Sequence, residues 1–153
     1  MTPTLTSQPR LRAACLRHLG PYQQIASTFA RFEAIAEAAG LFDSPPQLVA
    51  VYHDNPTTVP AAELRSDAGL LIAEGTAVPD GLTEVILAAG QYVHARHLGP
   101  YDTLPATWAR LKESLASGSG PRRGPGPGYE IYRNNPMTAA PKDLITDVFI
   151  PVA

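Results

Sequence analysis

A six-residue segment occurs twice in this chain with an identical sequence. Arg-His-Leu-Gly-Pro-Tyr stands at residues 17–22 and again at 96–101, which is 79 positions later. The match continues at the same spacing, where Thr-Phe-Ala-Arg-Phe (28–32) aligns with Thr-Trp-Ala-Arg-Leu (107–111). After a one-residue shift, four more pairs align: Tyr52 with Tyr132, Asn55 with Asn135, Pro56 with Pro136 and Asp67 with Asp147. We therefore interpret the chain as two copies of one supersecondary unit, because an internal repeat constrains a fold more than any single motif.

Each copy is predicted to contain a strand, a helix and two further strands. The helices are indicated by apolar residues at three- and four-residue steps, and the strands by short apolar runs between Gly, Pro and Asn. In the first copy we expect these elements at 10–17, 23–39, 48–52 and 68–73, with Gly40 as a left-handed helix C-cap. In the second copy we expect them at 91–97, 103–116, 129–132 and 148–152. The predicted class is α+β, a pseudo-two-fold duplication of the strand-helix-strand-strand unit.

Length and composition limit the classes of protein to consider. A chain of 153 residues favours a single domain, with repeats at about 10–73 and 90–152. Charged residues make up 17% and the net charge is −2, a balance without the basic stripe typical of nucleic-acid binding. Cys15 is the only cysteine, so neither an intramolecular disulfide nor a thiolate metal site can form. The polar N-terminus and the lack of a long apolar run predict a cytoplasmic protein without a membrane partner.

The two copies provide an internal comparison. Residues shared by both copies are expected to serve the fold, and these include His18 and His97, Gly20 and Gly99, Tyr22 and Tyr101, and Asp67 and Asp147. Polar residues present in one copy only are candidates for function. Ala50 of the first copy is replaced by Glu130, and Phe29 by Trp108.

Glu130 has two alternative interpretations. In a strand with a two-residue period it shares a face with Tyr132 and Gly128, and that face either meets water or lines a concavity beside aromatic rings. In the second case the carboxylate needs a partner, and a bound organic cation would supply one. Trp108 lies on the apolar stripe of its helix, so it is expected to pack in the core. Its ring also suits stacking on a flat cation.

Two other features have weaker functional interpretations. His94 and His97 have a metal-like spacing, but residues three apart on a strand point to opposite faces, so we reject a zinc site and expect no metal. Residues 117–128 are rich in Gly, Pro and Arg, which is typical of a flexible surface loop. Arg122 and Arg123 could close over an anionic ligand, although solvated arginines are the commoner case.

The order of the motifs resembles a known family. His-Leu-Gly-Pro-Tyr precedes each predicted helix, Tyr-His-Asp-Asn-Pro stands at 52–56, Leu-Arg-Ser-Asp-Ala-Gly at 64–69, and Tyr-Glu-Ile-Tyr at 129–132. In these residues the chain resembles the GyrI-like small-molecule-binding domains, also known as the effector-binding domains of AraC-type and MerR-type regulators. The resemblance extends from about Leu11 to Val152.

The resemblance implies an antiparallel sheet with two helices flanking a cleft. It also implies that flat, amphipathic, often cationic compounds bind in that cleft, and that Glu130 is the charged contact. Regulators of this kind carry a preceding helix-turn-helix region, for which the first predicted strand near residue 10 leaves no room. We therefore expect a stand-alone member without direct nucleic-acid binding, and the resemblance implies no cofactor.

Three functions follow as hypotheses. The first is a binding module for hydrophobic or cationic aromatic compounds, with Glu130 as counter-ion. Its walls would be Trp108, Tyr22, Tyr101, Tyr132 and Phe29. The second is a hydrolase of cyclopropane-bearing DNA-alkylating compounds, in which Glu130 becomes a catalytic residue that orients or deprotonates water. The third, for which no residue can be nominated, is inhibition of DNA gyrase by protein contact. The sequence leaves the natural ligand and the oligomeric state open.

Overall fold

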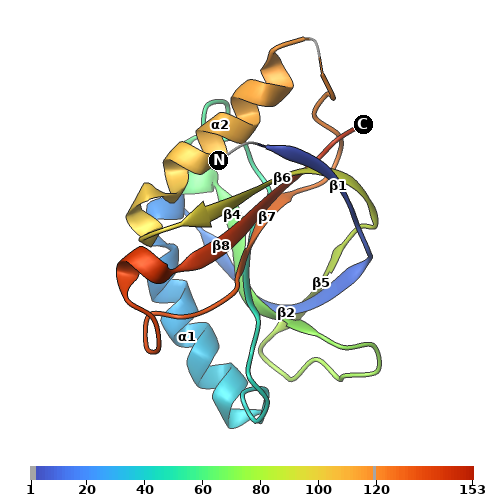
Figure 1. Ribbon diagram of the computed structural model, residues 1–153. Coiled ribbons are helices and arrows are strands. Elements are labelled where there is room, and N and C mark those ends of the chain that lie inside the picture. The colour runs from blue at the N-terminus through green and yellow to red at the C-terminus, as the bar shows by residue number, and fades with distance from the viewer. Residues whose placement is uncertain (1–2, 119) are drawn as a thin grey trace. The chain divides into compact units, whose positions relative to one another are not determined.

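The structure is a computed structural model that describes residues 3–118 and 120–153. These residues form two compact units, and each is described by itself (Figure 1). The α1 unit comprises Arg10–Leu87. The α2 unit comprises the described residues before Arg10 together with Ala88–Ala153. Among the described residues, no helix is both long and apolar enough to span a membrane.

The α1 unit contains one helix and four antiparallel strands. The strands lie in the order β3-β4-β2-β5, and α1 packs on β2 and β4. The bounds are β2 Leu11–Leu19, α1 Ile25–Ala38, β3 Leu48–Tyr52, β4 Arg65–Ile72 and β5 Thr83–Leu87. Short 3-10 helices at Tyr22–Gln24 and Ala61–Glu63 precede α1 and β4. Phe32 and Ala36 of α1 are fully buried against the sheet residues Ala14, Ala68 and Leu70.

The α2 unit repeats this arrangement. Its strands lie in the order β1-β6-β8-β7, all antiparallel, and α2 covers one face at β6 and β8 (Figure 1). The bounds are β1 Thr4–Gln8, β6 Gly90–Leu98, α2 Leu104–Ala116, β7 Gly128–Tyr132 and β8 Ile145–Pro151. Here the 3-10 helices are Tyr101–Thr103 and Pro141–Asp143. Leu104 and Leu111 of α2 pack against Val93, Val148 and Ile150.

The predicted α+β class and the predicted order of strand, helix and two strands are both present in the structure. The helices α1 and α2 begin 79 positions apart, at Ile25 and Leu104, as do β2 and β6. β3 and β7 begin 80 positions apart, as do β4 and β8. The one-residue shift between the aligned motifs therefore falls in the connection between each helix and the next strand.

Two strands were not predicted. β1 and β5 begin at Thr4 and Thr83, again 79 positions apart, and each lies at the edge of its unit's strands. Most residues of both strands are exposed or half-buried. An edge strand with little buried surface lacks the regular alternation of apolar and polar residues that marks a strand in a sequence. The structure therefore adds one edge strand to each predicted unit.

Some element boundaries also differ from the prediction. α1 begins at Ile25 rather than at 23, because Tyr22–Gln24 forms a 3-10 turn. β4 and β8 each begin three residues earlier than predicted. The predicted C-cap is confirmed: Gly40 has φ +76°, and the Leu41 N–H donates to the Ala36 carbonyl over 3.0 Å.

The repeated histidines hold each Gly-Pro turn to the helix that follows it. The Nε2 atom of His97 donates to the Pro100 carbonyl over 3.0 Å, and the Thr107 hydroxyl lies 2.8 Å from Nδ1. His18 makes the same two contacts with Pro21 and Thr28, at 2.9 and 2.6 Å. Both histidines are 5% exposed. This role of His18 and His97 agrees with the prediction that residues shared by both copies serve the fold.

The sequence predicts a flexible surface loop at residues 117–128, but part of this connection pairs with the residues that follow β8. Arg123 forms an antiparallel bridge with Val152. The Gly124 N–H donates to the Pro151 carbonyl, and the Ala153 N–H donates to the Arg122 carbonyl, each over 2.9 Å. The guanidinium of Arg123 donates to the carbonyls of Gly124 and Gly126. These backbone bonds fix residues 122–124 of the connection beside residues 151–153.

Candidate functional site

Strand β7 directs Glu130 toward the face of the sheet that α2 covers. Glu130 is paired across the sheet with Val148, which belongs to the apolar cluster under α2. Tyr132 lies two residues further along β7, on the same face. The predicted sharing of one face by Glu130 and Tyr132 is therefore confirmed. The alternative in which Glu130 faces water is wrong, because only 3% of this residue is exposed.

Two aromatic side chains donate hydrogen bonds to the buried carboxylate. The indole N–H of Trp108 donates to Oε1 of Glu130 over 2.6 Å, and the hydroxyl of Tyr132 donates to Oε2 over 2.5 Å. Each carboxylate oxygen thus accepts a bond from a ring that is itself half-buried. Bonds to an ionised acceptor are short and roughly twice as strong as neutral ones. The arrangement stabilises a negative charge among aromatic rings.

Tyr101 extends this group of rings. Its ring centroid lies 5.3 Å from that of Tyr132 at an interplanar angle of 59°. The pKa of Tyr101 is raised, first by burial and second by the negative charge of Glu130. In the part of the chain that the structure describes, the hydroxyl of Tyr101 makes no hydrogen bond with another protein group. We call Glu130, Trp108, Tyr132 and Tyr101 the Glu130 cluster.

Gly128 makes room for the indole ring. A Cβ atom added to Gly128 would lie 2.9 Å from two carbons of the Trp108 ring and 3.1 Å from the Phe149 carbonyl oxygen. The equivalent residues of the α1 unit are Leu48 on β3 and Phe29 on α1. The change from phenylalanine to tryptophan is therefore accompanied by loss of a side chain on the neighbouring strand.

The family model of the GyrI-like small-molecule-binding domain matches residues 1–153, the whole chain. The chain belongs to this family. This confirms the resemblance inferred from the repeated motifs, and it establishes the chain as a GyrI-like small-molecule-binding domain.

Curated relatives of this GyrI-like chain carry the name DNA gyrase inhibitor. The relative from Salmonella typhimurium is 33% identical over 111 residues, which are 71% of this chain and 70% of the relative. The relative from Klebsiella pneumoniae is 35% identical over 108 residues, which are 68% of this chain and 67% of the relative.

Solved structures show the same fold at low sequence identity. The C-terminal domain of EcmrR has a TM-score of 0.79 at 15% identity, covering 99% of this chain and 97% of that domain. SAV2435 bound to tetraphenylphosphonium has a TM-score of 0.66 at 13% identity, covering 100% and 94%. A hydrolase from Listeria innocua has a TM-score of 0.63 at 16% identity, covering 99% and 92%.

The other two predicted wall residues of the GyrI-like chain belong to the α1 unit. The hydroxyl of Tyr22 donates to the Asp54 carbonyl over 2.8 Å and accepts from the Asp54 N–H over 3.0 Å. Its ring contacts Tyr52 at 4.8 Å between centroids. Phe29 packs against Phe32 at 6.3 Å within the core under α1. These contacts give both residues a structural role in their own unit, and their predicted part in ligand binding stays a prediction.

Sequence reasoning missed Gly128 as a residue of the site. It was identified only as a neighbour of Glu130 on the same face. The structure was needed to show that α2 packs on the sheet in such a way that the Trp108 ring fills the space above Gly128. A usable signal was present in the comparison of the two copies, because Gly128 replaces the larger Leu48 and Trp108 replaces the smaller Phe29.

The two histidines with metal-like spacing have separate partners. Nε2 of His94 donates to Asp147 over 2.8 Å, whereas His97 is bonded to Thr107 and Pro100. Asp147 also accepts bonds from Arg96 and Arg133. Burial alone would raise the pKa of Asp147, but these three donors outweigh it and hold that pKa well below its usual range. Within residues 3–118 and 120–153, no group of three potential ligands could hold a metal ion.

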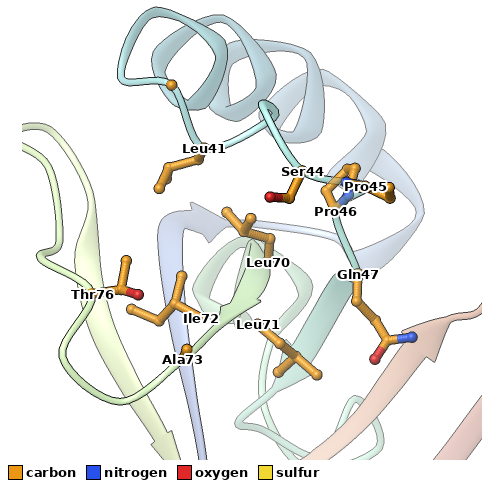
Figure 2. Close-up of a pocket in the computed structure, with 11 residues that line it drawn as sticks. Leu41, Ser44, Pro45, Pro46, Gln47, Leu70, Leu71, Ile72, Ala73 and Thr76 are labelled. Atoms are coloured by element: carbon orange, nitrogen blue, oxygen red, sulfur yellow. The ribbon is translucent and has the colours of Figure 1, made fainter.

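A cavity of about 480 Å³ lies in the α1 unit, and none of the predicted site residues lines it. It is bounded by the connection that follows α1 and by the end of β4 (Figure 2). No member of the Glu130 cluster lines it.

Proposed function

We propose that this GyrI-like domain binds hydrophobic aromatic compounds, often flat and cationic, at the Glu130 cluster. The observation that carries the proposal is the buried carboxylate of Glu130 held between the indole N–H of Trp108 and the hydroxyl of Tyr132. A carboxylate surrounded by rings attracts an aromatic cation in two ways, through its charge and through the faces of the rings. A cation–π contact contributes about 0.5–2 kcal/mol, and a charged hydrogen bond or ion pair about 1.5–3 kcal/mol.

A structural neighbour supports this ligand class. SAV2435, which shares the fold, was solved with tetraphenylphosphonium, an aromatic cation that cannot donate a hydrogen bond. Such a ligand has to be recognised by charge and by aromatic contact, which are the two features that the Glu130 cluster offers. The hydroxyl of Tyr101 adds a polar group at the edge of the same cluster, and it could contact ligands that do hydrogen-bond.

The test compares a cation with a neutral compound of similar shape. Trp108 is the only tryptophan, so its fluorescence reports on the cluster directly. Titration with tetraphenylphosphonium should quench this emission saturably, and Glu130→Gln should weaken that binding about tenfold or more. The same substitution should weaken the binding of triphenylphosphine oxide, which is neutral, much less. Glu113→Gln, on the exposed side of α2, is the matched control. Equal affinity of Glu130→Gln and the native protein for the cation would overturn the counter-ion role.

Hydrolysis is a second candidate, favoured by the short contact between Tyr132 and Glu130. A tyrosine hydroxyl 2.5 Å from a carboxylate could pass a proton to a leaving group while the carboxylate orients water. The substrates would be cyclopropane-bearing DNA-alkylating compounds. Incubation of such a compound with the protein, followed by mass spectrometry, tests this directly. A product with one added water that Glu130→Gln fails to form supports hydrolysis, and saturable binding without product excludes it for that compound.

Inhibition of DNA gyrase is a third candidate, favoured by the names of the curated relatives. A supercoiling assay with purified gyrase tests it without reference to the Glu130 cluster. Inhibition that persists in Glu130→Gln would indicate a protein surface separate from the ligand site.

A further inference from the structure

We infer that the α1 unit holds a second ligand site, which takes an uncharged and largely apolar small compound. The site is the cavity of about 480 Å³ between β4 and the connection after α1 (Figure 2). Its volume lies within the range of about 300–1,000 Å³ that is usual for small-molecule sites. None of its eleven lining residues is charged, so the cavity offers no counter-ion to an ionised ligand.

The floor of this cavity is apolar. Leu70 of β4 is buried, whereas Leu41 and Ile72 pack against the same core under α1 but are only half-buried. In Figure 2, Leu41 and Leu70 point toward one another across the cavity. The apolar core of the α1 unit is therefore partly open to solvent at this point. An apolar compound bound here removes that surface from water, and this burial is what drives the binding of such ligands.

Two hydroxyl groups border the apolar floor. The hydroxyl of Ser44 comes from the connection after α1 and points toward the floor in Figure 2, and that of Thr76 comes from the loop after β4. Within the described part of this unit, neither hydroxyl is hydrogen-bonded to another protein group. Because a hydroxyl both donates and accepts, the two groups suit a ligand that carries an uncharged polar atom on an apolar body.

The connection that forms one wall is held in place at both ends. The Leu41 N–H donates to the Ala36 carbonyl over 3.0 Å, and the Gln47 carbonyl accepts from the Leu71 N–H over 2.9 Å. Between these bonds, the pair Pro45-Pro46 has two fixed φ angles. A wall that is ordered before the ligand arrives loses little entropy on binding. Because the bond to Gln47 occupies the edge of β4, the ligand is a compact compound rather than an added strand.

The opposite wall is fixed by a cation that does not line the cavity. The guanidinium of Arg12 donates to the carbonyls of Ala73 and Thr76 over 2.7 and 3.0 Å. It also donates to the carboxylate of Glu84 over 2.6 Å, which pairs its charge. The loop after β4 is therefore anchored without placing a charge in the lining.

The two copies of the repeat differ at this place. Ile72 aligns with Val152 of the α2 unit at a spacing of 80. In the α2 unit the connection stays beside the strand end, where Arg123 forms a bridge with Val152. In the α1 unit the backbone groups of residues 44–46 make no hydrogen bond within the described range, and the cavity lies between them and β4. As with Glu130, a feature of one copy only is a candidate for function.

A matched pair of fluorescent compounds tests the site. N-Phenyl-1-naphthylamine is apolar and uncharged, carries one N–H, and emits strongly only in apolar surroundings. Its emission should rise saturably with the native protein. 1-Anilinonaphthalene-8-sulfonate adds a negative charge to the same body, and it should bind at least about tenfold more weakly, because the lining offers the charge no partner. Equal affinity for the two compounds would contradict an uncharged ligand.

Protein variants locate the binding of the amine. Thr76→Asp introduces a charge into the lining and Ser44→Phe fills the cavity, and each should weaken binding at least about tenfold. Ala77→Asp makes the same change in charge at the neighbouring exposed residue, which does not line the cavity, and should bind as the native protein does. Thermal unfolding checks that the variants are folded. The inference is overturned if no saturable rise occurs up to the solubility of the amine, or if either lining variant keeps the native affinity.

Substitutions in the two sites separate this inference from the proposed function. Glu130→Gln should leave the binding of N-phenyl-1-naphthylamine unchanged, and Thr76→Asp should leave the binding of tetraphenylphosphonium unchanged. Loss of amine binding in Glu130→Gln would assign the amine to the Glu130 cluster and overturn the second site. Failure of the amine to bind at all leaves the proposed function untouched.

Discussion

Gly128 lies directly beneath the indole ring of Trp108, at a distance that leaves no space for a side chain. The glycine and the tryptophan together set the position from which the indole N–H reaches Glu130. The α1 unit has leucine and phenylalanine at the equivalent positions, and alanine in place of the glutamate. The α2 unit therefore differs from the α1 unit at three residues of the candidate site that lie together.

Gly128→Ala should displace the indole ring and break its bond to Glu130. The added methyl group would meet two ring carbons at 2.9 Å, so either the ring or the strand has to move. Overpacking of this kind costs about 1–3 kcal/mol of unfolding free energy. The emission of Trp108 should shift and binding of the cation should weaken. Gly120→Ala is the control, because an added Cβ there meets nothing within 4 Å. Unchanged emission in Gly128→Ala would contradict the role given to this glycine.

Thr107→Val should destabilise the protein although it preserves the shape of the side chain. The hydroxyl of Thr107 is bonded to Nδ1 of His97, and both residues are buried. Loss of the hydroxyl leaves a buried ring nitrogen without its partner, at a cost of about 1–3 kcal/mol. Thr28→Val in the α1 unit should cost a similar amount, and Thr107→Ser should cost much less. Urea denaturation measures all three, and equal stability of the valine and serine variants would refute this explanation.

Stability should fall in acid through the protonation of Asp147. The pKa of Asp147 is lowered in the folded protein, because its three donors outweigh the effect of burial. A lowered folded pKa stabilises the protein above the ordinary value of 3.8, and this contribution is lost as the pH falls below that value. Asp147→Asn should cost about 3 kcal/mol at pH 7 and less near pH 3. Denaturation at both pH values measures the difference, with the exposed Asp80→Asn as control. A pH-independent cost would contradict the assignment.

Cys15 should resist thiol reagents in the folded protein. Burial, and to a lesser degree the charge of Asp67, raises the pKa of its thiol well above the ordinary value. The side chain is also covered, since this residue is only 1% exposed. Reaction with a disulfide reagent at pH 8 should be at least about 100-fold slower than in urea, because each pKa unit lowers the thiolate fraction about tenfold. Since Cys15 is the only cysteine, Cys15→Ser gives the background. Equally fast reaction in buffer and urea would mean that the thiol is accessible.

Most of the fold could be predicted from the repeat and from periodicity. The two helices and six of the strands follow from apolar spacing and from Gly-Pro punctuation, which are local signals. β1 and β5 could not be predicted in this way, because a strand such as Thr4–Gln8 acquires its structure from pairing with β6 rather than from its own pattern. Strand pairing between residues far apart in the sequence is not encoded in a short window.

The candidate site was accessible to the same reasoning only in part. The alternation along β7 predicted the face that Glu130 shares with Tyr132, and the difference between the copies drew attention to Glu130 and Trp108. The hydrogen bond between these two side chains could not be predicted, because it depends on how α2 packs on the sheet. The cavity between β4 and the connection after α1 could not be predicted at all, since it depends on the path of a connection rather than on any motif.

The pairing of β1 also has a consequence for synthesis of the chain. β1 is made before the α1 unit, yet its partner β6 begins only at Gly90. At about 5–20 residues per second, a ribosome needs roughly 4–17 s to make the intervening chain. During that time α1 and its four strands can be completed, so the α1 unit has the opportunity to fold first. The α2 unit can close only after β6 has been made, around a strand that precedes the whole α1 unit in the chain.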